Sequence, residues 1–152
     1  KEFLGEVPKE EILNHITLIR ELAGDHAALR ALHFVCENER VKKEVDALRK
    51  DNFPKFLANV KESGDSSFKY LQNVYTCHDV QHQNVSIALA LSDVIFGEKG
   101  VCRVHGGGFA GTIQAFVPNY LVPDYQKEMD TIFGKGSCEV LKIRKYGGIK
   151  VL

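Results

Sequence analysis

Apolar residues spaced by three and four positions dominate the first hundred residues of the chain, which is the period of amphipathic helices. The first such stripe comprises Ile12, Ile16, Ile19 and Ala23. It predicts a helix from Pro8 to Leu22 that Gly24 ends. A second helix is predicted from Asp25, as its N-cap, to about Lys50. Its inward residues are expected to be Leu29, Leu32, Cys36, Val41, Val45 and Leu48.

Three further helical segments are expected before residue 100. Asp51 to Ser63 has helical spacing, and the polar stretch "ESGDSS" (Glu62 to Ser67) is expected to interrupt it. Asp65 or Ser66 is then expected to cap a short helix through Tyr75. The strongly apolar segment from Val80 to Phe96 predicts a nearly buried helix. Its inward residues are expected to be Ile87, Leu91, Val94 and Ile95.

The period changes in the last third of the chain. Strands are predicted at Val101 to His105 and Thr112 to Val117, and a helix at Tyr120 to Phe133. Alternating residues predict a half-buried strand at Cys138 to Arg144, and Ile149 to Leu152 is expected to form a last short strand. Helices followed by strands indicate an α+β fold with a small, mainly antiparallel sheet packed against helices.

The composition of the chain narrows the classes of function that we expect for it. The chain has 152 residues, enough for one domain, and 20 Lys and Arg balance 20 Asp and Glu. A net charge of zero gives no reason to expect nucleic acid or an anionic membrane as a partner. There is no apolar run of the ~20 residues that a membrane span needs. Four cysteines without framework spacing indicate reduced thiols in a cytoplasmic protein.

Gly106 to Gly111 forms a G-x-G-x-x-G pattern between the two predicted strands. A dinucleotide site needs this pattern to open a helix, whereas "TIQAFVP" after it reads as a strand. The lysine of a P-loop is absent, and too little chain follows for a protein-kinase flap. Two interpretations stay open: an anion-binding loop that a ligand approaches closely, or a tight connection with unusual dihedral angles.

Two longer motifs resemble a known family. "RVHGGGFAGTIQAFVP" (Arg103 to Pro118) is similar to the third motif of the GHMP kinases, although many members have glycine at the position of Ala110. "RALHFVCENERV" (Arg30 to Val41) resembles a helix of galactokinases in particular. "SFKYLQN" and "IALALSD" follow in the order expected of that family. The resemblance covers nearly the whole chain.

The resemblance implies that residues 1–152 form the ferredoxin-like C-terminal lobe of a longer galactokinase. Such an enzyme transfers the γ-phosphoryl group of Mg-ATP to the 1-hydroxyl of galactose. The family's first two motifs and its catalytic aspartate have no counterpart here. We therefore expect no catalytic residue in this chain, Mg-ATP bound mainly by the N-terminal lobe, and no activity of the chain alone. That lobe is also the expected partner surface. A start at Lys1, with Met129 the single methionine, agrees with a piece of a longer protein.

The same resemblance assigns the loop to the phosphate site. The loop residues are Gly106, Gly107, Gly108, Phe109, Ala110 and Gly111. A non-catalytic sugar- or nucleotide-binding module of the same fold, or a kinase of a related sugar, is the alternative.

A second set of candidates lies on the predicted helix from Asp25. Arg30, His33, Glu37 and Arg40 are three and four residues apart, so they can form a polar ladder, which we expect to be structural. His78 and His82, with Cys102 and His105, have spacing too loose for a metal site, and none is expected.

Overall fold

The computed structural model describes residues 1–109 and 111–143, which form two compact units, Lys1–Val117 and Pro118–Leu152. Its described residues form helices and one small antiparallel sheet, so the predicted α+β class is confirmed. Ala110 of the glycine loop and the expected strand at Ile149 to Leu152 lie outside the described residues. Each unit is described by itself below.

The first unit begins with a short 3₁₀ turn and three helices. These are η1 (Leu4–Glu6), α1 (Lys9–Asn14), α2 (Ile16–Ala23) and α3 (Asp25–Arg49). The prediction of one helix from Pro8 to Leu22 was wrong, because the backbone leaves helical geometry at His15 (φ −108°, ψ 14°). Gly24, with φ +84°, separates α2 from α3 as predicted. Asp25 lies in the first turn of α3 and pairs with Arg20 instead of capping the helix.

The polar stretch "ESGDSS" does not interrupt the helix that contains it. Helix α4 (Phe53–Ser66) begins after Asn52, whose side chain accepts a hydrogen bond from the Lys55 amide at 3.1 Å. It runs through the stretch as far as Ser66 and continues without a break into a π-helical turn, η2 (Ser67–Leu71). The predicted break and cap were wrong because Ser63 and Ser66 are buried and bond to side chains of α3, so they do not compete for the α4 backbone. Gln72, with φ +55°, ends the helix.

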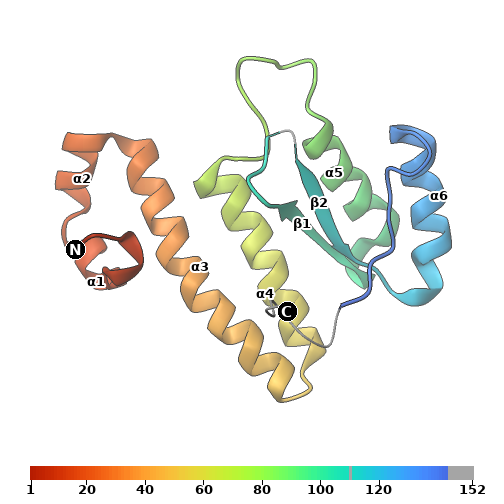
Figure 1. Cartoon of the computed structure of the whole chain (residues 1–152), viewed down its shortest axis with the longest axis horizontal. Helices are drawn as coiled ribbons and strands as arrows, with labels where there is room; N and C mark the ends of the chain where they lie inside the picture. Colours follow the sequence, from red (N-terminus) through yellow and green to blue (C-terminus); the bar gives the residue numbers. More distant parts are fainter. Residues whose placement is uncertain (110, 144–152) are drawn as a thin grey trace, which may run out of the picture. The chain divides into compact units, whose positions relative to one another are not determined.

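A β-hairpin follows. Strands β1 (Val101–His105) and β2 (Thr112–Phe116) pair antiparallel, with Val104 opposite Ile113, so both predicted strands are confirmed apart from Val117. The hairpin lies between α4 and α5 (Asn84–Phe96) in Figure 1, and both helices contact β1. The 3₁₀ turn η3 (Gly97–Lys99) joins α5 to β1. A small hydrophobic core lies under α5, formed by Val74, Val85 and Val104 with Leu89 and Ile113.

Two predicted apolar faces are not buried as expected. On α5, Val94 is 81% exposed and Ile87 is also exposed, because the helix buries only the side that faces the hairpin. On α3, the expected inward residues Val41, Val45 and Leu48 are exposed, since the described neighbours cover other sides of this half of the helix. These three residues, spaced by four and three, are called the α3 stripe below.

The second unit contains η4 (Asn119–Leu121) and α6 (Val122–Phe133), which ends at Gly134 as predicted. The chain then folds back on α6: Gln126 donates to the Cys138 carbonyl at 2.8 Å, and Asp130 accepts from the Cys138 amide at 3.0 Å. These bonds to a helix replace those of a ladder, so the strand predicted from Cys138 is absent within the described residues 138–143. Throughout the described residues, the helices are too short or too polar to cross a bilayer.

Candidate functional site

The glycine loop joins β1 to β2 with an unusual backbone. Gly106 (φ +70°), Gly108 (φ +80°) and Phe109 (φ +58°) all lie in the left-handed region. The Gly111 amide donates to the Gly108 carbonyl at 3.1 Å, which closes the turn. A non-glycine residue in this region is uncommon, so Phe109 must be held there by its surroundings.

One side of the loop is open. Gly106 and Gly107 are exposed, and a Cβ added to either would meet no atom within 4 Å among the described residues. In residues 1–109 and 111–143, the amides of Gly106, Gly107 and Gly108 donate to no acceptor. Consecutive unpaired amides in a loop with alternating backbone conformation can bind an anion such as a phosphate group. The open side therefore has the chemistry that an anion-binding loop needs.

The other side packs closely on Asn73. The Phe109 amide donates to the Asn73 carbonyl at 2.6 Å, and the Asn73 side-chain amide donates to the Gly107 carbonyl at 3.4 Å. A Cβ at Gly108 would lie 2.0 Å from the Asn73 carbonyl oxygen. Gly108 thus needs to be glycine for two reasons, its positive φ and this contact. We call Gly107, Gly108 and Phe109 the crest of the loop.

A partly buried polar cluster holds β1 itself. Arg103 donates to one carboxylate oxygen of Glu37 at 3.3 Å, and Ser63 donates to the same oxygen. Arg40 donates to the other oxygen. Because these side chains come from α3, α4 and β1, one carboxylate joins three elements. We call Glu37, Arg40, Ser63 and Arg103 the strand brace.

The surroundings of the strand brace disfavour a second negative charge. Glu44 lies nearby with one carboxylate oxygen buried and unpaired among the described residues. Burial and the negative charge of Glu37 raise the pKa of Glu44 above its ordinary value. Gly64 lets α4 approach the strand here, since a Cβ would lie 3.1 Å from the Cys102 carbonyl oxygen and from the Arg103 Cβ.

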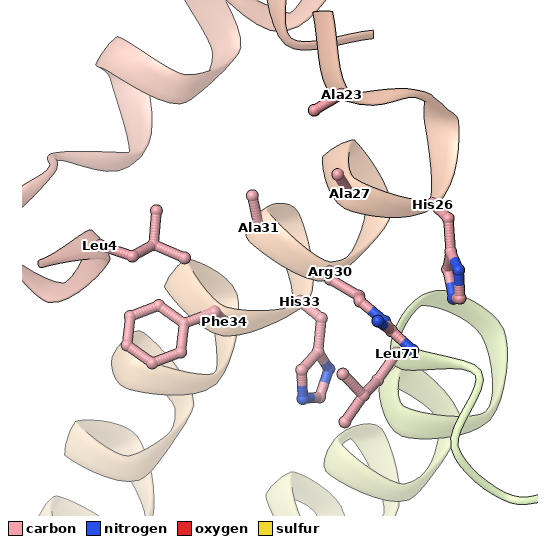
Figure 2. Close-up of a pocket in the computed structure, with 9 residues that line it drawn as sticks. All are labelled: Leu4, Ala23, His26, Ala27, Arg30, Ala31, His33, Phe34 and Leu71. Carbon is pink, nitrogen blue, oxygen red and sulfur yellow. The ribbon is translucent and has the colours of Figure 1, made fainter.

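The predicted ladder residues divide between two places. Glu37 and Arg40 belong to the strand brace, whereas His33 bonds to the Ser66 hydroxyl at 2.9 Å. Burial lowers the pKa of His33, which favours its neutral form. Arg30 and His33 both line an open surface pocket of about 710 Å³ between α3, η1 and η2. Figure 2 shows Arg30 extending past His33 toward Leu71, while the alanines of α3 line the other part of the pocket.

The cysteine and histidine candidates do not gather into a metal site. In the part of the chain that the structure describes, no three His, Cys, Asp or Glu side chains are placed to hold a metal ion. His82 pairs with Asp79 instead. Burial, and then the nearby Asp93 carboxylate, raise the pKa of Cys102 to about 12, so this thiol stays protonated at neutral pH.

Comparison with known proteins identifies relatives of the chain. No family model matches it. It is 29% identical over 124 residues to the galactokinase of Glaesserella parasuis serovar 5 (strain SH0165), which is 82% of this chain and 30% of that protein. It is 32% identical over 101 residues to a galactokinase of Haemophilus influenzae (strain ATCC 51907 / DSM 11121 / KW20 / Rd), which is 66% of this chain and 24% of that protein.

This chain is a relative of the galactokinases. The resemblance inferred from its motifs is thereby confirmed. A galactokinase of Actinobacillus pleuropneumoniae matches similarly, at 30% identity over 116 residues, or 76% of this chain and 28% of that protein. The chain spans about a quarter to a third of the length of the curated galactokinases it matches.

Sequence reasoning identified the glycine loop but not the residues that hold it. Asn73 and Arg103 were not singled out, and Ser63 and Ser66 were taken for a helix stop. Asn73 is the last residue of the segment "SFKYLQN", but nothing in that segment marks the asparagine as a residue that contacts the loop. Gly64 did have one, since glycine inside a helical pattern often marks a close approach of backbones.

Proposed function

We propose that this chain is the C-terminal lobe of a galactokinase that transfers the γ-phosphoryl group of Mg-ATP to the 1-hydroxyl of galactose. The observation that carries the proposal is the similarity to galactokinases over most of the chain and only a quarter to a third of each relative. The open glycine loop supports it, because its unpaired amides suit the oxygens of a phosphoryl group.

The chemistry of the loop defines its share of the reaction. Amide N–H groups donate hydrogen bonds to anions and do not ligate cations, so the loop suits phosphate and not Mg²⁺. Phosphoryl transfer depends on positioning and on stabilising negative charge at the transferred group. The loop would therefore form one wall of the site, with the catalytic base, most Mg-ATP contacts and the sugar contacts supplied by an N-terminal lobe.

The α3 stripe is a candidate surface for that lobe. Val41, Val45 and Leu48 are each more than 40% exposed although they form one apolar line on a helix. Contiguous exposed apolar surface commonly marks an interaction site. We propose that the N-terminal lobe covers this stripe in the intact protein.

Activity of the intact gene product tests the proposal. ADP release with galactose and Mg-ATP should be well above the blank for the intact product and equal to the blank for this chain alone. An intact product that binds galactose or ATP without releasing ADP would favour the alternative, a non-catalytic module. Turnover with a different sugar in preference to galactose would favour a kinase of a related sugar.

A substitution at Gly107 tests the role of the loop. Gly107→Ala adds a methyl group on the open side, where no described atom lies within 4 Å, at a position without positive φ. We expect kcat of the intact product to fall by about tenfold or more, because small displacements in such a site are costly, and the melting temperature to stay the same.

Gly5→Ala is the matched control. Gly5 also lacks a positive φ, and an added Cβ there would be in ordinary contact with Phe34 at 3.8 Å. Neither kcat nor the melting temperature should change. A Gly107→Ala protein with normal kcat would mean that the loop is only a tight connection between the strands.

A further inference from the structure

We propose that Asn73 is the positioning residue of the glycine loop, holding the crest so that its open amides face the transferred phosphoryl group. This inference rests on the proposed function. Asn73 touches no substrate in this scheme, because it lies on the side of the crest opposite the open one.

The contacts between Asn73 and the crest are both polar and steric. The backbone carbonyl of Asn73 accepts a hydrogen bond from the Phe109 amide, and its side-chain amide donates one to the Gly107 carbonyl. The absent side chain of Gly108 leaves the space that the Asn73 backbone and amide occupy, at 2.0 Å and 2.7 Å from the position of a Cβ. One residue thus contacts all three residues of the crest.

Asn73 is itself firmly placed. It is only 4% exposed, and the next residue, Val74, packs in the core with Val104 of β1. The preceding residue, Gln72, has φ +55° and bonds through its amide to the Ser67 carbonyl at 2.8 Å. The crest is therefore fixed to the end of a helix and to the hydrophobic core, not only to the two strands that carry it.

The chemistry of the side chain matters as well as its size. A neutral amide donates to the Gly107 carbonyl without adding charge beside the crest. A carboxylate there would face that carbonyl oxygen and repel a phosphoryl group. The second polar atom of the Asn73 side chain, Oδ1, is buried and has no partner in the described part of the chain.

Asn59 provides a matched control. It is equally buried, its Oδ1 is also unpaired among the described residues, and its side-chain amide donates to the Lys55 carbonyl at 2.9 Å. That bond lies within α4 and does not involve the loop. Asn73→Ala and Asn59→Ala thus remove the same groups, and only the first removes a contact with the crest.

Two measurements on the intact gene product test the proposal. Asn73→Ala keeps the backbone carbonyl that accepts from the Phe109 amide and removes the side-chain bond to the Gly107 carbonyl. Because the crest then opens more easily by about the free energy of that one bond, hydrogen exchange of the Phe109 amide should accelerate about fivefold relative to the amides of β1 and β2. The same variant should lose about tenfold in kcat with KM for galactose within about twofold. Asn73→Asp should lose more kcat than Asn73→Ala despite its closer shape.

The outcomes separate this inference from the proposed function. Equal exchange and kcat in the Asn73→Ala and Asn59→Ala proteins would overturn the inference. Faster exchange at Phe109 with unchanged kcat would also overturn it, because the loop would then need no positioning. A wild-type product without kinase activity would refute both the proposed function and the catalytic part of this inference, while exchange at Phe109 would still decide whether Asn73 holds the crest.

Discussion

The strand brace and the crest hold the same hairpin in different ways. At the brace, one carboxylate, Glu37, accepts hydrogen bonds from three elements, and Gly64 brings α4 against β1. At the crest, Asn73 contacts a loop whose other side is open among the described residues. The brace secures the position of the strand, whereas the crest contacts set only the backbone conformation of a few residues.

This difference separates stability from function. Partly buried charged hydrogen bonds and close helix–strand packing contribute to the unfolding free energy. Contacts within an exposed loop contribute little to it but determine where its amide groups lie. We therefore expect changes at the brace to lower stability with little effect on kcat of the folded protein, and changes at the crest to lower kcat far more than they lower stability.

The largest effect is expected for Gly108→Val. Valine resists φ +80°, and its Cβ would lie 2.0 Å from the Asn73 carbonyl oxygen, so the crest must move. In the intact product, kcat should fall by about a hundredfold, as for a displacement near 1 Å in such a site. Backbone strain should also cost on the order of 1–3 kcal/mol of unfolding free energy. Initial rates and denaturant unfolding measure the two effects, and near-normal kcat would contradict the expected role of the crest.

The next effect is expected for Glu37→Gln. The variant loses the charge that joins Arg40 and Arg103, which should lower the unfolding free energy by about 2 kcal/mol. Urea unfolding measures this change. Glu39→Gln is the control on the same helix, since the exposed pair of Glu39 with Lys9 should contribute far less. Equal losses in the two variants would mean that the brace is an ordinary surface cluster.

A somewhat smaller loss is expected for Gly64→Val. Its branched side chain would press on the Cys102 carbonyl and the Arg103 Cβ, so α4 must shift away from β1. Overpacking of this kind costs about 1–3 kcal/mol, while replacing a helical glycine recovers part of that amount. Thermal unfolding should show the loss, and kcat per folded molecule should stay near normal. A large drop in kcat without destabilisation would argue against the separation of brace and crest.

The smallest expected effect is on the pH dependence of the unfolding free energy. Burial lowers the pKa of His33 below its ordinary value of 6.5, so the folded protein favours neutral imidazole. Well above pH 6.5 the residue is neutral in both states and adds no pH dependence. As pH falls below 6.5, the unfolded chain takes up a proton that the folded protein resists, and stability decreases. His33→Gln should reduce the slope of unfolding free energy between pH 6.5 and 5. Equal slopes in wild type and His33→Gln would contradict the burial of His33 beside Ser66.

The local sequence pattern alone was sufficient to predict much of the secondary structure of this protein and its family. The change from a period of three and four to alternation predicted helices first and a hairpin afterwards, because each period places one apolar face toward a core. Glycines between two β-branched segments predicted a loop at Gly106 to Gly111. The motifs around Arg103 and Arg30 were long enough to indicate the galactokinases, to which the comparisons confirm a relationship.

Tertiary contacts decided the rest. "ESGDSS" contains the residues of a helix stop, yet it stays helical because α3 offers partners for Ser63 and Ser66 and β1 lies against Gly64. The α3 stripe has the spacing of a buried face, but burial depends on what covers it. Cys138 to Ile143 alternates like a strand and forms none in the described residues, and the backbone of Cys138 bonds to side chains of α6 instead. Asn73 holds the crest only because the fold brings residues 34 positions apart together, which no local pattern records.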